Sequence, residues 1–189
     1  MIVIVPYRAS WPGEFRAIGS DLRRALSDLA LRIDHIGSTA VPGLAAKDRI
    51  DIQVSVRSLG PAVESALHAA GYARLVDITQ DHIPPAGPDQ AEQWRKWLFR
   101  PPESLRPVNV HIRLSGRANQ RYALLFRDFL RADPASAQAY AQVKLALARY
   151  HPDNFDAYYD VKDPVCDLIL AGAELWAAAQ GWEPGPSDC

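Results

Sequence analysis

Apolar and polar residues alternate in several short runs within the first 115 residues. Strict alternation over four to eight residues is typical of a half-buried β-strand. The predicted strands are residues 2–5, 31–36, 49–56, 72–78, 94–100 and 108–114. Residues 11–30 and 61–70 instead repeat apolar side chains every three or four positions, which predicts two helices between the strands.

From Asn119 onward the apolar positions follow a helical period throughout. Breaks at Asp133-Pro134 and His151-Pro152 divide this part into three helices. The sequence therefore predicts an α+β fold, with a mixed β-sheet flanked by helices and a helical C-terminal third from about residue 117. A chain of 189 residues fits one domain over residues 1–182, followed by a flexible tail at 183–189.

A Gly-Ser turn precedes the first strongly alternating strand. Gly37-Ser38 follows a short apolar run, so that its backbone N–H groups can open toward an anion. On the next predicted strand, Asp51 and Gln53 share one face because side chains alternate across a strand. Asp51 is either an exposed side chain or a ligand, and the nearby Gly-Ser turn favours contact with a metal or a substrate.

Other residues near this turn suit phosphate binding. Ser38 could cap a helical turn and bind an anion at once, and Thr39 adds a second hydroxyl. Lys47 is either a solvated side chain or a point charge that reaches a phosphate. His35 is expected to fix the turn through a hydrogen bond.

The strand at 108–114 carries a second polar face with His111 and Arg113. A neutral imidazole is a good metal ligand and a general base, so His111 is a candidate partner of Asp51. Arg127, Asp128 and Arg131 are expected to form a polar seam with Lys144 and Lys162, although either lysine could face the ligand.

The segment HIGSTAVPGLAAKDRIDI, residues 35–52, closely resembles the signature of the GrpB family (UPF0157-type). Further matches to this family are VHIR at 110–113, FRDFLR at 126–131, and the spaced Tyr140 and Lys144. The resemblance implies the nucleotidyltransferase-fold superfamily, in which Gly-Ser is followed by two acids on one strand. Here Gln53 replaces the second acid, and His111 stands in the region of the third.

This resemblance implies a nucleotidyltransferase that moves a nucleotidyl group from a nucleoside triphosphate to an unknown acceptor. Asp51 and His111 would be catalytic and would hold Mg²⁺ or Mn²⁺. The residues expected to bind the substrate or its phosphates are Gly37, Ser38, Thr39, Lys47, Gln53 and Arg113. Two alternatives stay open: a nucleotide- or small-molecule-binding module that has lost two-metal chemistry, and a one-metal phosphoesterase that uses Asp51, His111 and His82.

Composition narrows the partners. A formal net charge of -1 gives no global basic field for duplex DNA or an anionic membrane, so the expected partner is a nucleotide or another phosphorylated small molecule. Two cysteines form no disulfide framework and no apolar run is long enough to cross a bilayer, which predicts a cytoplasmic protein.

Residues 81–93 are predicted to form a loop or flap. Trp176 and Trp182 would serve either a homodimer or packing within the monomer.

Overall fold

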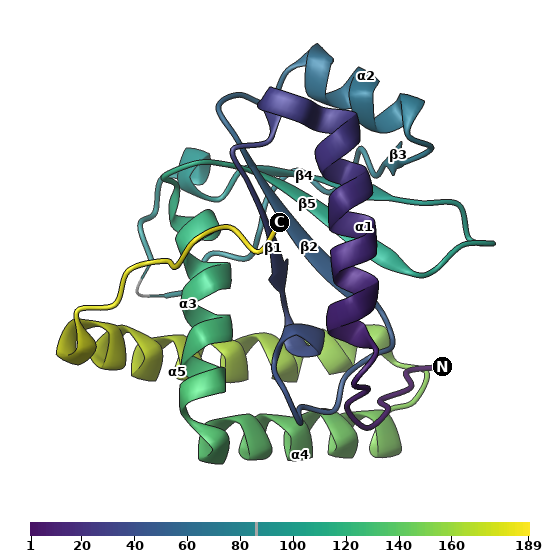
Figure 1. The fold of residues 1–189 in the computed structure, drawn as a ribbon. Coiled ribbons are helices and arrows are strands. Elements are labelled where there is room, and N and C mark those ends of the chain that lie inside the picture. The colour runs from purple at the N-terminus through teal and green to yellow at the C-terminus, as the bar shows by residue number, and fades with distance from the viewer. Residues whose placement is uncertain (86) are drawn as a thin grey trace.

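A mixed five-stranded β-sheet forms the centre of the protein in the computed structural model, which describes residues 1–85 and 87–189 (Figure 1). The strands are β1 (Arg32–Ile36), β2 (Ile50–Val56), β3 (Ala73–Arg74), β4 (Lys96–Arg100) and β5 (Val108–Leu114). Their order across the sheet is β1-β2-β5-β4-β3. Among the described strands only β2 and β5 are parallel neighbours, and this pairing sets Asp51 beside Asn109 and Gln53 beside His111.

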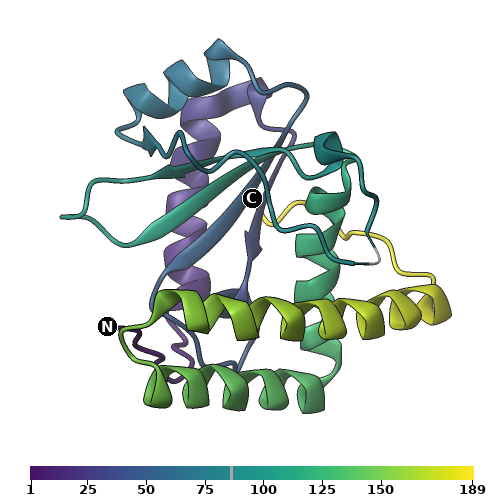
Figure 2. The ribbon, with the colours of Figure 1, turned by 180° about the vertical axis from the view of Figure 1, so that it is seen from behind.

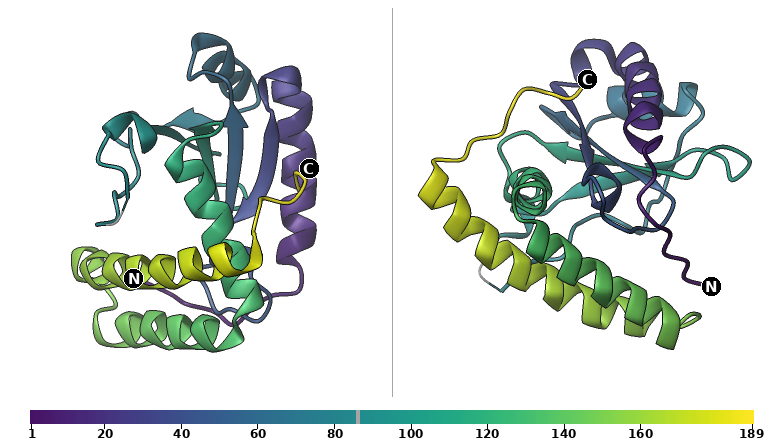
Figure 3. Two further views of the ribbon diagram at one scale, coloured as in Figure 1. Left: turned by 90° about the vertical axis from the view of Figure 1, so that its left-hand side faces the viewer. Right: turned by 60° about the horizontal axis from the view of Figure 1, so that its bottom comes forward.

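One face of the sheet is apolar because every second residue of the strands is an aliphatic or aromatic side chain. Ile50, Ile52 and Val54 of β2 are fully buried on this face. The helices α1 (Trp11–Leu26) and α2 (Pro61–Ala69) cover it and complete the main core with Trp11, Phe15, Leu22 and Leu67 (Figure 3, left). The polar residues of β2 and β5 consequently point to the opposite face.

The helical C-terminal third covers that opposite face and one end of the sheet. Helix α3 (Ala118–Ala132) lies across the polar face, and α4 (Pro134–Tyr150) and α5 (Phe155–Gln180) run side by side below the sheet (Figures 1 and 2). The Asp133 carboxylate accepts hydrogen bonds from the N–H groups of Ala135 and Ser136, so α4 begins directly after α3 ends. Gly181 ends α5 in the left-handed conformation.

The predicted α+β class with a helical C-terminal third is confirmed, while two predicted strands are wrong or too long. Residues 2–5 form only a bridge between Val5 and Ala46, because Ile2 packs against Leu147 and Tyr158 instead of joining the sheet. The strand expected at 72–78 is reduced to Ala73–Arg74, because the chain turns away after it and leaves Val76 exposed.

The tail of residues 183–189, expected to be flexible, lies along the edge strand β1 (Figure 3, right). The Cys189 N–H donates to the Ile33 carbonyl (3.1 Å), and the Ile33 N–H donates to Ser187 Oγ (2.9 Å). Asp188 accepts hydrogen bonds from the His35 N–H (2.9 Å) and from Arg127 (2.7 Å). The tail thus covers backbone groups of a sheet edge that would otherwise be free to pair.

Both tryptophans near the C-terminus contact residues of the same chain. Trp176 packs against Phe129 with ring centroids 6.0 Å apart, and Trp182 Nε1 donates to Asp128 (3.3 Å). Packing within the monomer therefore accounts for them, and the homodimer stays a prediction. None of the described helices is both long and apolar enough to span a membrane.

Replacing Ile52 with alanine should lower the free energy of unfolding by about 2–5 kcal/mol, because the side chain is fully buried at the centre of the sheet and its loss leaves a cavity. Urea denaturation would measure the change. Val76→Ala is the matched control: its side chain is 64% exposed, so stability should change by less than about 0.5 kcal/mol. Equal losses in the two variants would contradict this account of the core.

Candidate functional site

The Gly-Ser turn and Asp51 lie together at one end of the sheet. Ile36, the last residue of β1, pairs with Asp51 at the start of β2, so Gly37 follows directly beside the carboxylate. Gly37 has a φ of 69°, and a Cβ built on it would lie 2.8 Å from Asp51 Oδ2. This position therefore requires glycine for two reasons, its backbone conformation and its closeness to the carboxylate.

The Asp51 side chain is 29% exposed and is held at one oxygen. Asn109 Nδ2 donates to Oδ1 (2.8 Å), and His111 Nε2 lies 3.5 Å from the same atom. Burial would raise the pKa of Asp51, but His111, Asn109 and the Arg49 charge outweigh it and hold the pKa below its usual value. Within the described chain Oδ2 accepts no hydrogen bond, so one oxygen of an ionised carboxylate is free for a ligand.

His111 lies on β5, which pairs with β2 on one side and β4 on the other, and its side chain is mostly buried. Burial lowers its pKa, and the charges of Arg113 and Lys96 lower it further, against the opposing effect of Asp51. Burial therefore favours the neutral form of the imidazole. Its Nδ1 atom is buried and has no hydrogen-bond partner among the described residues.

Lys144 of α4 reaches the Gly-Ser turn from below. Its side chain is 2% exposed, and Nζ contacts Ser38 Oγ (2.8 Å) and donates to the Ala45 carbonyl (2.6 Å). Burial lowers the pKa of Lys144 to about 7, although Asp51 acts in the opposite direction. Ser38 is thereby fixed beside an ammonium group that gains or loses its proton close to neutral pH.

A second lysine packs on aromatic rings of α5. Lys47 Nζ lies 4.0 Å from the ring centroid of Tyr158 and 5.1 Å from that of Tyr159. Burial and the neighbouring charges of Lys162 and Arg49 lower the pKa of Lys47. These cation–π contacts hold the ammonium group at the same end of the sheet as Asp51.

Positive charge surrounds the single carboxylate. Burial lowers the pKa values of Lys47, Arg100 and Lys144 and the Asp51 charge partly offsets this effect, while the Arg49 charge helps to lower the pKa of Asp51. These mutual effects show that the groups lie close enough to interact. The site is thus locally basic although the chain has a net charge of -1. We refer to Gly37, Ser38, Lys47, Asp51, Asn109, His111 and Lys144 as the Asp51 site.

Thr39, a predicted phosphate ligand, is instead buried inside the turn. Its hydroxyl is 3.0 Å from His35 Nε2, and His35 stacks on Phe15 with ring centroids 4.7 Å apart. The prediction that His35 fixes the turn is confirmed. Burial lowers the pKa of His35 to about 4, so the ring is neutral and supports the turn without adding charge to it.

Gln53 and Arg113, also predicted as ligands, bind each other and the flap. Arg113 donates to Gln53 Oε1 (2.7 Å) and to both oxygens of Asp81 (2.8 and 2.9 Å). Gln53 Nε2 donates to the Gln120 carbonyl (3.1 Å). Both side chains are buried on the face of the sheet that α3 covers, and they are not in contact with solvent.

Asp81 is the centre of this buried network, which the sequence reading did not identify. Besides Arg113, its carboxylate accepts hydrogen bonds from Lys96 (2.6 Å) and Asn119 (3.0 Å). Burial opposes ionisation, but Arg113 and Lys96 hold the pKa of Asp81 far below its usual value. The network ties the flap, β4, β5 and α3 together and fixes the strand that carries His111.

The donor set does not fit a two-ion metal centre. Among the residues that the structure describes, no three His, Cys, Asp or Glu side chains lie close enough together to hold a metal ion. Asp51 and His111 form a pair without a third ligand. His82, expected to complete a one-metal site, contacts Asp167 of α5 (3.0 Å).

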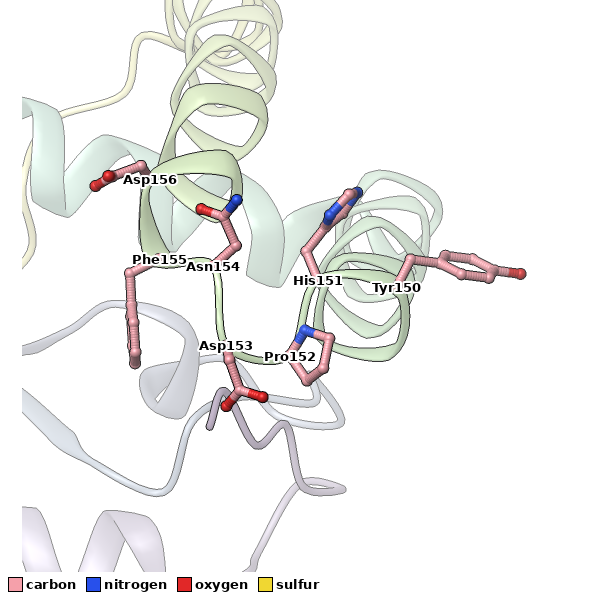
Figure 4. Close-up of a pocket in the computed structure, with 7 residues that line it drawn as sticks. All are labelled: Tyr150, His151, Pro152, Asp153, Asn154, Phe155 and Asp156. Atoms are coloured by element: carbon pink, nitrogen blue, oxygen red, sulfur yellow. The ribbon is translucent and has the colours of Figure 1, made fainter.

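Two residues of the site were missed or left undecided by sequence reading. Asn109 shares the polar face of β5 with His111, and this alternation is the signal that could have assigned it to Asp51. For Lys144 the sequence predicted only that it lies on a helix, because its contact with Ser38 depends on how α4 packs below the sheet. A separate hollow of about 660 Å³ at the α4–α5 corner, lined by residues 150–156, includes no predicted site residue (Figure 4).

Comparison with known proteins places this geometry in context. A family model described as GrpB protein matches residues 1–171. A UPF0157 protein of Pseudomonas aeruginosa is 35% identical over 91% of this chain and 67% of its own length. The crystal structure of conserved protein GrpB from Enterococcus faecalis is similar with a TM-score of 0.76 and 28% identity, covering 92% of this chain and 99% of that one.

Longer relatives are also similar. A protein of Mycolicibacterium paratuberculosis named dephospho-CoA kinase is 40% identical over 96% of this chain. The match covers 48% of that protein, so the chain spans about half the length of the curated relatives it matches first. The kinase name describes those longer proteins.

Gly37→Ala should destabilise the protein more than Gly43→Ala. Both glycines have positive φ (69° and 79°), so both variants incur backbone strain of about 1–3 kcal/mol. Only at Gly37 does the added Cβ meet Asp51, whereas nothing lies within 4 Å at Gly43. Thermal unfolding of both variants measures the difference. A loss at Gly37 no larger than at Gly43 would show that the turn and the carboxylate are not in contact.

Proposed function

Because the chain belongs to the GrpB family, and because its Asp51 site is basic around one carboxylate, we propose that this site binds a phosphorylated small molecule, in particular a nucleotide. The observation that carries the proposal is the position of Lys144. A lysine that is 2% exposed, with its ammonium group on Ser38 Oγ, loses hydration that a bound anion would replace.

The turn supplies further groups for an anion. In the described part of the chain, the backbone N–H group of Ser38 donates to no other protein group, and Ser38 is partly exposed. Lys47 adds a second charge at the same end of the sheet. A phosphate here would accept hydrogen bonds from the turn and compensate the lysines, which is the usual chemistry of a backbone anion site.

Asp51 suits the uncharged part of such a ligand. A carboxylate repels phosphate, but its free Oδ2 accepts a hydrogen bond from a hydroxyl or amino group. A nucleotide carries both kinds of group, with phosphates at one end and ribose hydroxyls close by. The ligand would therefore place its phosphates toward Lys144 and Ser38 and a donor group toward Asp51.

Nucleotidyl transfer is the second candidate, and the contact of Asp51 with the Gly-Ser turn favours it. In the implied reaction, metal ions would neutralise phosphate charge and orient the attacking oxygen. Among the described residues of this site, Asp51 and His111 are the groups that could hold an ion, since Gln53 is hydrogen-bonded to Arg113 and Gln120. Binding without metal is therefore the function that the residues support best.

Lys144→Met should weaken ATP binding at least about tenfold, because it removes the buried charge that faces the turn. Arg57→Met is the control, since it removes one positive charge at an exposed position beyond the end of β2. Isothermal titration calorimetry with and without EDTA gives both comparisons. No binding of ATP or pyrophosphate by the parent protein would end the proposal.

The same titrations separate the two candidates. If EDTA leaves ATP affinity unchanged and Asp51→Asn binds ATP as well or better, the anion is bound directly. If EDTA and Asp51→Asn both abolish binding, a metal bridges carboxylate and phosphate, and release of pyrophosphate should then be tested with Mn²⁺.

Sulfate affinity should fall at least about tenfold between about pH 6 and about pH 9. Burial lowers the pKa of Lys144 to about 7, so the ammonium form that attracts an anion is present below that pH and is lost above it. Sulfate keeps its charge across this range, so the slope reports on the protein. Lys144→Met should bind sulfate weakly and with little pH dependence; an unchanged slope in this variant would assign the titration to another group.

A further inference from the structure

A second cavity, of about 620 Å³, lies between the flap, the first turns of α3 and the middle of α5. Its volume is within the range of about 300–1,000 Å³ that is usual for small-molecule sites. It shares no lining residue with the Asp51 site. Apart from Arg121, Asp167 and Glu174, the residues that line it are apolar or aromatic.

The charged groups at this cavity are already paired with one another or with the flap. Arg121 forms an ion pair with Glu174, and Asp167 contacts His82 Nε2 at 3.0 Å. The indole Nε1 of Trp94 donates to the Pro88 carbonyl (2.7 Å). A charged ligand would lose its hydration here without gaining a free partner, whereas an uncharged apolar ligand would not.

The aromatic wall is held in place by its neighbours. Trp94 is 2% exposed and meets Tyr122 edge to face, with ring centroids 6.1 Å apart. Tyr122 in turn stacks on Phe126. A Cβ on Gly87 would lie 2.7 Å from the Trp94 ring, so the flap rests directly on this side chain. The wall is therefore preformed.

One large apolar side chain of the lining stays in water. Leu168 of α5 is 75% exposed, although it belongs to the cavity wall. A ligand that covered it would remove apolar surface from water at about 25 cal/mol per Å².

We propose that this cavity is a second binding site, separate from the Asp51 site, for a small uncharged apolar molecule that carries a ring. The occupant is a small molecule because the walls come from three elements and enclose a volume of ligand size. It is uncharged because the ion pairs of the wall are internal. A ring suits a wall that contains Trp94, Tyr122 and the prolines of the flap, because aromatic rings pack well on such side chains.

The neutral fluorescent probe N-phenyl-1-naphthylamine tests the proposal on the full chain. Its emission should rise on binding, and Ala171→Trp, which fills the cavity from α5, should weaken binding at least about tenfold. Ala178→Trp is the matched control, because Ala178 is exposed on the same helix outside the lining. Absence of binding by the parent protein, or equal affinity in both variants, would overturn the inference.

A second pair of variants controls for misfolding and for a different occupant of this face. Leu168→Asp should weaken binding of the probe because Leu168 lines the cavity. Leu175→Asp should leave binding unchanged because Leu175 lies outside the lining, although both leucines are about three-quarters exposed on α5. If both substitutions instead dissociate a dimer seen by sedimentation, a second copy covers this face and the inference is wrong. Lys144→Met should bind the probe normally, so a failure here is distinguishable from a failure of nucleotide binding.

Discussion

The parallel pairing of β2 with β5 decides where the polar groups of this protein meet. It sets Asp51 beside Asn109 and Gln53 beside His111, so that one face of two central strands carries polar side chains. Such a face cannot be left bare beneath a helix, because buried polar groups need partners. Asp81 of the flap and the backbone of α3 supply them, through Arg113 and Gln53. Asp51, at the start of β2, keeps one carboxylate oxygen without a hydrogen bond from the described residues.

The sequence is informative where local pattern and local chemistry agree. The alternation in β2 and β5 and the helical period after residue 117 predicted the class of fold, and the Gly-Ser turn predicted a close approach to Asp51. Gln53 and Arg113 show the limit of this reasoning. Both lie on the polar face as expected, but Arg113, which binds Gln53, is held by Asp81 from a loop whose path has no periodic signal. The hydrogen bonds of the tail to β1 have no signal in the sequence for a similar reason, since they depend on long-range contacts.

Local charge differs from global charge in this protein. The composition gives almost no net charge, yet Lys47, Arg49, Arg100 and Lys144 gather around one carboxylate. Lys144 comes from α4, about a hundred residues after the turn that it contacts. The helical third is therefore part of the site rather than an appendage, since it supplies the buried ammonium group.

The flap is closed at its base by backbone hydrogen bonds. The Lys96 backbone N–H donates to the Thr79 carbonyl (2.9 Å), Gln80 pairs with Arg95 in a β-bridge, and the Asp81 N–H donates to the Trp94 carbonyl (2.8 Å). A loop fastened in this way can change length at its tip for only about 0.6 kcal/mol per doubling, by closure entropy alone. Insertions or deletions there would leave the stem, and with it the setting of His111, intact. The length of the flap and the geometry of the sheet are therefore independent of each other in this fold.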